Sequence, residues 1–401
     1  MLVNDEYMRR SIFLTFFAIL LSPPGFSQDS LQLDARDWLV RKGIWKARPE
    51  KNNFLFLLPV VGANPSAGFI YGAGLTYAYL SNDGEPRMST ISSNASYSTK
   101  KLMNLNVKSN LFVFGNRLFL NGDWRYFVIS EITFGLASST HSPGQSLRYA
   151  LSRFHETASF KLAPNLFAGF GIHYDQQFHI DDKTTDAGDT AIAYHYQYSS
   201  SHGFNPGHYT TNGYSLNILF DNRDNPIDSY EGYYINVNYR INETSLGSSK
   251  TSAVLLTEYR SFFSLDGDKR RNILALWLYG NYLITGNLPY LMLPAIGYDQ
   301  RQRSGRGFPF GRFRGESLLY EETEYRFPIS YGTGILGGVI FLNLTSTSNR
   351  EEKISLLDYV QPAYGAGLRI MVDKVSRTRL QLDAGIGGGR LGLYFGVREA
   401  F

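Results

Sequence analysis

The 401-residue sequence contains no cysteine and few charged residues. Without cysteine, disulfide bonds, thiolate nucleophiles and cysteine-bound metals are excluded. Charged residues make up 18% of the chain, against about 25% in ordinary soluble domains. The formal net charge is only +4, with the two signs interspersed. The sequence therefore lacks the basic block that nucleic-acid binding needs, and no nucleic-acid partner is expected.

Long hydrophobic runs are also missing. The one sustained apolar segment, residues 11–21, is too short to span a bilayer, which needs about 20 residues. It follows Arg9 and Arg10 and precedes a stretch with small residues, which is the order of a secretory signal peptide. We therefore expect residues 1–27 to be a cleaved signal peptide of an exported protein. An N-terminal membrane anchor is the alternative, while the absence of cysteine excludes a lipoprotein anchor.

Aromatic residues and glycine are abundant. Tyr, Phe and Trp form 15% of the chain, and there are 39 glycines. The mean hydropathy of −0.22 is that of a soluble protein, but a membrane barrel that alternates apolar and polar residues has the same average. Such alternation is present in residues 233–242, 316–327 and 377–384. Since successive side chains of a strand point to opposite faces, each segment has one apolar and one polar wall.

A soluble β-sandwich also shows alternation. Two features favour a membrane barrel instead: the apolar faces carry many aromatics near strand ends, as at a membrane interface, and the segments are longer than the about 5–6 residues of soluble strands. We expect sixteen strands after a polar linker at residues 28–52, and an even number suits a single-chain barrel. They are predicted at 54–62, 67–80, 87–99, 101–114, 117–129, 148–162, 165–179, 210–221, 231–243, 250–265, 271–285, 316–328, 332–344, 360–373, 376–385 and 390–401.

The lengths of the connections agree with that count. Connections after even-numbered strands are short, and the long ones all follow odd-numbered strands, at 130–147, 180–209, 286–315 and 345–359. Short periplasmic turns and longer outer loops are typical of outer-membrane barrels. The predicted fold is an all-β, 16-stranded antiparallel transmembrane outer-membrane β-barrel at residues 53–401, with no second folded domain.

The last predicted strand has features of an insertion signal. Alternation places Leu391, Leu393 and Phe395 on the same face as the terminal Phe401, and Glu399 would then lie near the lower membrane interface. The terminal aromatic resembles the C-terminal signal by which outer-membrane proteins are recognised for insertion. We expect that signal to consist of Tyr394, Gly396 and Phe401.

Two further motifs stand out. A turn motif contains Asp221, Arg223, Asp224, Asn225, Pro226 and Gly232; Asp and Asn accept backbone hydrogen bonds in turns, and Pro and Gly set its backbone angles. The second is the loop 286–315, with Arg306-Gly307-Phe308 followed by Glu324 on the next strand. Its five arginines would suit a solvated loop. Alternatively the loop folds into the lumen, where Arg306 pairs with an inward carboxylate, Glu324 being the best placed by parity.

These motifs carry a resemblance over about residues 53–401. The RDNP…EGYY turn, the RGF…GRFRG loop, the EYRFP strand and the closing GAGLRI…LQLDAG…YFGVREAF look like the BamA/TamA family, also known as the bacterial surface antigen superfamily. The likeness is to the short, barrel-only members that are common in Bacteroidota and lack POTRA domains. It implies a lumen-loop lock made by Arg306, Gly307, Phe308 and Glu324. It also implies a weak seam between the first and last strands, which glycines near the last strand would weaken further.

The resemblance implies a role in assembly, insertion or translocation of outer-membrane components. One departure is Asn343, at a position where the family usually has an aspartate, so that the lock would rest on Glu324 alone. A second departure is that residues 28–52 are too short for a POTRA domain. The expected partners are outer-membrane lipid and other outer-membrane proteins or lipoproteins, as clients or complex partners. A passive channel and a structural partner barrel are the alternatives.

Catalytic and cofactor motifs are missing. No P-loop, dinucleotide fingerprint, zinc motif or recognisable Ser–His–acid relation is present, so we expect neither an enzyme nor a cofactor. The region of loop 180–209 contains imidazoles and carboxylates that could serve as metal ligands. They match no ligand spacing, and we assign no metal to them: His179, Asp181, Asp182, His195, His202 and His208.

Overall fold

The computed structural model describes residues 33–43, 53–64, 68–80, 87–139, 143–183, 193–267, 272–374, 376–397 and 399–401. The predicted signal peptide lies outside the described residues. Within the predicted linker the structure has one short helix, α2 (Ala35–Arg41). No helix within these ranges is long and apolar enough to cross a membrane.

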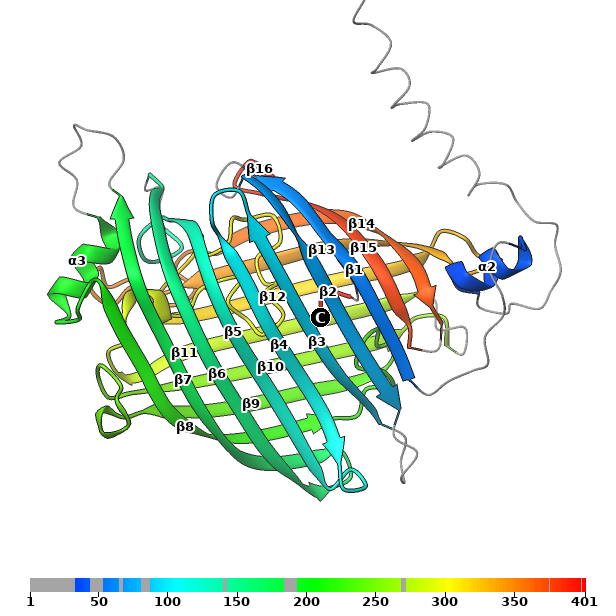
Figure 1. The fold of residues 1–401 in the computed structure, drawn as a ribbon, viewed down its shortest axis with the longest axis horizontal. Helices are drawn as coiled ribbons and strands as arrows, with labels where there is room; N and C mark the ends of the chain where they lie inside the picture. The colour runs from blue at the N-terminus through cyan, green and yellow to red at the C-terminus, as the bar shows by residue number, and fades with distance from the viewer. Residues whose placement is uncertain are drawn as a thin grey trace, which may run out of the picture.

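Sixteen strands form one antiparallel sheet, and each pairs with its neighbours in the sequence (Figure 1). The prediction of an all-β, sixteen-stranded fold is confirmed. A short helix, α3 (Tyr194–Ser201), lies in the connection that follows β7. The strands are β1 (Asn53–Asn64), β2 (Gly68–Leu80), β3 (Met88–Ser98), β4 (Met103–Val113), β5 (Leu118–Thr133), β6 (Gln145–Ala163), β7 (Leu166–Lys183), β8 (His208–Asp221), β9 (Gly232–Asn242), β10 (Ser252–Ser264), β11 (Ile273–Gly286), β12 (Ser317–Pro328), β13 (Leu336–Thr347), β14 (Gln361–Asp373), β15 (Thr378–Gly387) and β16 (Arg390–Val397).

Alternation along the strands gives the sheet an apolar outer face and a polar inner face. In β12, every second side chain is buried, including Glu322, Glu324 and Arg326. In β16, the outward Leu391 and Leu393 are 64% and 72% exposed. A soluble protein would bury the leucines and expose the charges. The opposite arrangement suits a wall that has hydrocarbon outside and a polar lumen inside.

The two ends of the sheet are not joined. Among the described residues, no backbone ladder connects β1 with β16, although each pairs with its other neighbour. We call the boundary between these two edges the seam. β1 has twelve residues and β16 has eight, so a pairing between them would leave part of β1 without a partner.

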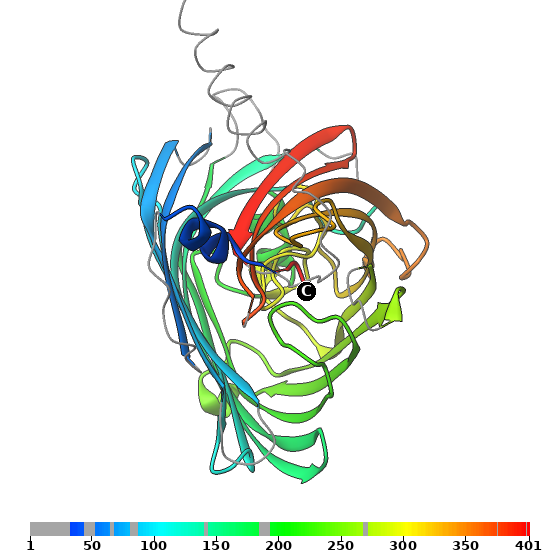
Figure 2. The ribbon, with the colours of Figure 1, turned by 90° about the vertical axis from the view of Figure 1, so that its right-hand side faces the viewer.

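Three segments fill the lumen. They are the connection 287–316 between β11 and β12, the connection 222–231 between β8 and β9, and the C-terminal residues 399–401. Figure 2 shows the end of the chain inside the ring of strands. Ala400 and Phe401 are at most 1% exposed. The prediction that the last strand continues to residue 401 is therefore wrong: β16 ends at Val397, and the chain turns inward.

The unpaired edges at the seam generate a prediction about backbone exchange. We expect amide hydrogens of β1 and β16 to exchange faster than those of β6 and β7, which are hydrogen-bonded to strands on both sides. Hydrogen–deuterium exchange of the detergent-solubilised barrel, read by mass spectrometry, measures this difference. Equal protection of all four strands would show that the sheet closes.

Candidate functional site

The connection 287–316 lies in the lumen. Its two ends contact each other and the wall of the barrel. Tyr290 and Arg314 have no exposed surface. The Arg314 guanidinium donates to the Tyr290 carbonyl at 3.1 Å and forms an ion pair of 3.2 Å with Glu131 of β5. Because the charge of Arg314 is compensated only in this folded position, the loop is anchored inside the barrel.

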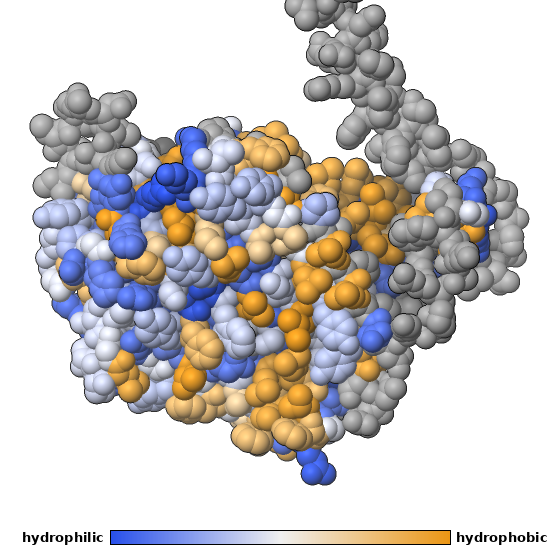
Figure 3. All heavy atoms as spheres, viewed as in Figure 1, coloured by the Kyte–Doolittle hydropathy of each residue, from blue (hydrophilic) through white to orange (hydrophobic). Residues whose placement is uncertain are grey.

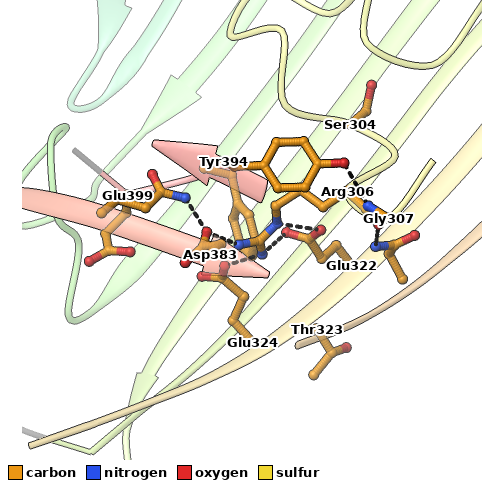
Figure 4. A network of polar contacts seen from close by, with 12 residues as sticks. Ser304, Arg306, Gly307, Glu322, Thr323, Glu324, Asp383, Tyr394 and Glu399 are labelled. Atoms are coloured by element: carbon orange, nitrogen blue, oxygen red, sulfur yellow. Dashed lines mark hydrogen bonds and ion pairs between the residues drawn. The ribbon is translucent and has the colours of Figure 1, made fainter. Parts of the chain in front are cut away.

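Arg306, near the middle of this connection, is surrounded by three buried carboxylates (Figure 4). Its Nη2 lies 2.6 Å from Oε1 of Glu322 and also contacts Glu324, and its Nη1 lies 2.6 Å from Oδ2 of Asp383. The guanidinium carbon is 3.7 Å from the centre of the Phe341 ring. We call Arg306, Glu322, Glu324 and Asp383 the Arg306 cluster. It ties the loop to β12 and β15 by charge-assisted hydrogen bonds away from water.

The residues after Arg306 fit closely against the inner wall. Gly307 has a left-handed φ of +101°, and a Cβ there would lie 2.9 Å from the Cβ of Ala363, closer than real side chains pack. Its amide donates to the Tyr394 hydroxyl of β16 at 2.8 Å. Phe308 is buried, with its ring 4.8 Å from that of Phe313. The loop therefore touches the seam strand as well as β12 and β15.

The expectation that Arg306 relies on Glu324 alone is wrong. Glu322 and Asp383 carry the same contact, and Asn343 contributes through its amide, which donates to the Arg306 carbonyl at 2.9 Å. The alternation in residues 316–327 and 377–384 puts Glu322 and Asp383 on the polar faces of their strands. Alternation shows on which face of a strand a side chain lies. It does not show at what height in the barrel each strand meets the loop, so these contacts could not be predicted.

The C-terminal residues join the same cluster through two arginines. Arg369 of β14 lies 2.5 Å from Asp383 and 2.6 Å from Glu399. Arg326 of β12 lies 2.7 Å from Glu324 and 3.8 Å from Glu399. The expectation that Glu399 lies at the lower membrane interface is therefore wrong. Its carboxylate is buried in the lumen, where two guanidinium groups compensate its charge; an apolar membrane boundary offers no such partner.

Phe401 follows Glu399 into the lumen, which corrects its predicted place on the lipid-facing side with Leu391. Its ring centroid is 5.4 Å from that of Trp277 and 6.1 Å from that of Phe262. The Arg326 guanidinium carbon lies 5.3 Å from the Phe401 ring centre. An aromatic pocket and a cation therefore hold the last side chain. The insertion-signal role of Tyr394, Gly396 and Phe401 stays a prediction.

The turn motif at residues 221–232 closes the lumen from the side of the short turns. Arg223 pairs with Asp221 at 2.8 Å, and its guanidinium carbon lies 4.6 Å from the centre of the Tyr234 ring. Asp224 pairs with Arg377, in the connection between β14 and β15, at 2.6 Å. The motif thus makes a turn and also bridges β8 to the far wall.

Asp228 connects this motif to the C-terminal residues. It lies 2.8 Å from Arg379 and 3.5 Å from Arg326, which also pairs with Glu324. Burial raises the pKa of Asp228; Arg379 and Arg326 oppose this shift, and the nearby Glu399 reinforces it. The loop, the turn motif and the C-terminal residues are therefore parts of one buried ionic network.

Of the candidate metal ligands of loop 180–209, the described part of the chain brings His195 and Asp182 into contact and does not gather a third. His195 Nδ1 lies 2.8 Å from Asp182, and the His208 ring bonds to Gln176 at 2.9 Å. His202 lies 3.6 Å from Glu351. Each imidazole has a different partner, and no group of three ligating side chains forms among the described residues.

We expect Arg306→Ala to destabilise the barrel strongly. The substitution leaves three buried carboxylates without the cation at their centre, and breaking such a pair costs about 3–5 kcal/mol. Urea unfolding in detergent micelles and heat-modifiable mobility on a gel measure the loss. Arg148→Ala, at an exposed position of β6, is the matched control. Equal stability of the two variants would contradict the central role of Arg306.

A smaller loss is expected for Glu399→Gln. Arg369 and Arg326 keep Asp383 and Glu324 as partners, so the change removes hydrogen bonds to charge without isolating a cation and should cost about 1–3 kcal/mol. The same unfolding assay measures it, with Glu352→Gln at an exposed loop position as control. An unchanged midpoint would show that the C-terminal residues add no stability from inside the lumen.

No curated protein matches the sequence. Among solved structures, the chain is similar to BamA from Haemophilus ducreyi lacking POTRA domains 1–3, at 15% identity and a TM-score of 0.54, covering 87% of this chain and 69% of that one. It is also similar to CdiB from Acinetobacter baumannii, at 13% identity and a TM-score of 0.50, covering 86% of this chain and 59% of that one. At these identities the likeness shows the fold alone.

The Omp85 superfamily domain matches residues 87–397. This range is more than half of the chain and contains the strands from β3 to β16 together with the loop that carries Arg306. The resemblance to the BamA/TamA family, inferred from the motifs, is thereby confirmed. The chain belongs to the Omp85 superfamily of outer-membrane β-barrels.

Proposed function

We propose that this barrel acts in the insertion or translocation of outer-membrane components, through the seam between β1 and β16. The observation that carries the proposal is that the described parts of these strands share no backbone ladder. Membership of the Omp85 superfamily supports the proposal. The role is a non-enzymatic one, in which the backbone edges are the working groups.

The physical basis is the cost of an unpaired strand edge in a membrane. Each unsatisfied backbone group in hydrocarbon costs several kcal/mol, so an extended segment that supplies hydrogen bonds is stabilised at either edge. Such pairing is β-augmentation, in which main-chain bonds provide affinity with little dependence on sequence. Gly392 and Gly396 weaken the strand pairing of β16, because glycine loses more conformational entropy in a strand and has no side chain to pack. A segment paired with β16 is therefore exchanged more easily.

The segments that occupy the lumen disfavour the rival function of a passive channel. The loop 287–316, the turn motif and the C-terminal residues all occupy the interior, and the Arg306 cluster fixes the largest of them. An open channel conducts steadily in a planar bilayer. This barrel is expected to show small, flickering currents, because conduction requires the buried ionic network to open.

We predict that a disulfide across the seam abolishes the function. The chain has no cysteine, so pairs can be introduced without background, one at Pro59 or Val60 of β1 and one at Phe395 or Val397 of β16, which line the same cavity at the seam. The pair that oxidises should stop insertion of other barrels, and reduction should restore it. A control disulfide joins Leu342 and Tyr364, which already face each other across β13 and β14. Activity with a fully oxidised seam would contradict the proposal.

Depletion of the protein identifies what depends on it. Quantitative proteomics of the outer membrane should show many unrelated barrels or lipoproteins falling together as envelope stress rises. If only this protein is lost, general assembly is overturned in favour of a channel or a dedicated structural partner barrel.

A further inference from the structure

A large cavity lies directly behind the seam. Its volume is about 620 Å³, and it is lined by Pro59 and Val60 of β1 on one side and by Phe395, Gly396 and Val397 of β16 on the other. This size is within the range of about 300–1,000 Å³ of ordinary small-molecule sites. The cavity therefore borders both edges through which material would pass.

The charge of the cavity lining is strongly unbalanced. Two acidic side chains, Asp221 and Glu399, line it. Five basic side chains also line it: Lys108, Arg223, Arg260, Arg301 and Arg303. Arg223 pairs with Asp221, Arg260 with Glu258 and Glu399 with Arg369, so the excess positive charge of the lining comes from Lys108, Arg301 and Arg303. Since cations gathered in a cleft with walls of low dielectric raise the local concentration of anions, the cavity is suited to a negatively charged group.

Two of the arginines, Arg301 and Arg303, are placed by a structured turn, in which Asp299 accepts the amide of Arg301 at 2.9 Å. Asp299 accepts the amide of Arg303 at 3.0 Å and the hydroxyl of Ser304 at 2.7 Å. Arg303 then reaches β16, where its Nη2 donates to the carbonyl of Phe395 at 3.5 Å. A Cβ on Gly396 would lie 2.1 Å from that nitrogen, so a larger residue there would push the guanidinium away from this position. A cation is thereby held on the inner side of the seam.

The outer side of the same seam is apolar. Leu57 of β1 is 69% exposed, and Leu393 and Phe395 of β16 are 72% and 65% exposed. Figure 3 shows hydrophobic side chains gathered over this part of the wall. A basic cavity and a hydrocarbon-facing surface thus meet at one boundary that no backbone ladder closes among the described residues.

We propose that the seam cavity binds the headgroup of an anionic phospholipid, whose acyl chains pass between β1 and β16 into the bilayer. The guanidinium fork matches phosphate geometry, and basic pockets between membrane-spanning elements bind lipid headgroups. Asp221, Arg223 and Pro226, on the side of the short turns, line the cavity. The lipid is therefore drawn from the periplasmic leaflet.

An anionic phospholipid fits both halves of this boundary. A free phosphate uses the basic lining and leaves the apolar edges unmatched. An acidic peptide likewise offers nothing to hydrocarbon. A lipid places its phosphate against Arg301 and Arg303 and its chains against the leucines outside. This site does not depend on the proposed assembly function, because it is tested on the purified barrel with no client present.

The test is native mass spectrometry of the purified full chain, released from mixed vesicles of phosphatidylglycerol and phosphatidylcholine. We expect one phosphatidylglycerol to be retained in preference to phosphatidylcholine. The double variant R301Q/R303Q should reduce that retention by about tenfold or more, since it removes charge-assisted bonds to the phosphate. R148Q, at an exposed position of β6, should retain the lipid as the unmodified chain does. Heat-modifiable mobility checks that each variant is folded.

A photo-crosslinking residue locates the lipid. Placed at Asn94, which lines the seam cavity, it should capture phosphatidylglycerol, whereas at Asn236, which lines the adjoining lumen cavity and not the seam cavity, it should not. Equal retention by R301Q/R303Q, equal capture at both positions, or release of the bound species by millimolar inorganic phosphate would each overturn the proposal. A polypeptide captured at Asn94 from vesicles that contain an unfolded barrel, with no lipid captured, would overturn it as well.

Discussion

The interior of this barrel is organised by the need to neutralise one guanidinium that has no contact with water. Arg306 comes from a connection between strands and ends among three carboxylates of the wall, on β12 and β15. A buried charge without partners costs several kcal/mol, a large share of the about 5–15 kcal/mol by which a domain is stable. The loop, β12 and β15 are therefore stable only in one mutual arrangement, and the inner surface of the barrel is built around it.

That constraint extends to the seam. Asp383 serves Arg306 and also Arg369, and Arg369 in turn holds Glu399. Glu399 reaches this position only because the chain leaves the wall after Val397. The electrostatics of the lumen and the weakness of the last strand are thus one feature: the residues that complete the ionic network are the ones that would have lengthened β16 and helped it to pair with β1.

The fold was largely predictable, and the network only in part. Apolar and polar residues alternate in segments such as 233–242 because one face of each strand contacts lipid and the other faces the polar lumen. Every strand of a barrel is subject to this difference. The contact between Arg306 and Glu324 followed from a motif together with parity. Asp383 did not, because β12 and β15 are separated by two strands, and alternation does not show that the loop brings their side chains to one cation. Alternation predicted that Phe401 lies on the outer face, because it assumes that the strand continues to the last residue. The strand instead ends at Val397, and the ion pair of Glu399 with Arg369 holds the following residues in the lumen.

Both proposals use the seam, and they draw on different properties of it. Strand exchange needs free backbone edges and is indifferent to charge, so it does not explain why Lys108, Arg301 and Arg303 line the space behind those edges. A headgroup site explains that charge and has a further physical consequence. A hydrated, lipid-occupied cavity keeps polar partners at the inner side of edges whose outer side faces hydrocarbon. The lipid would thereby lower the cost of keeping the seam open, so the composition of the periplasmic leaflet would set how readily the seam exchanges strands.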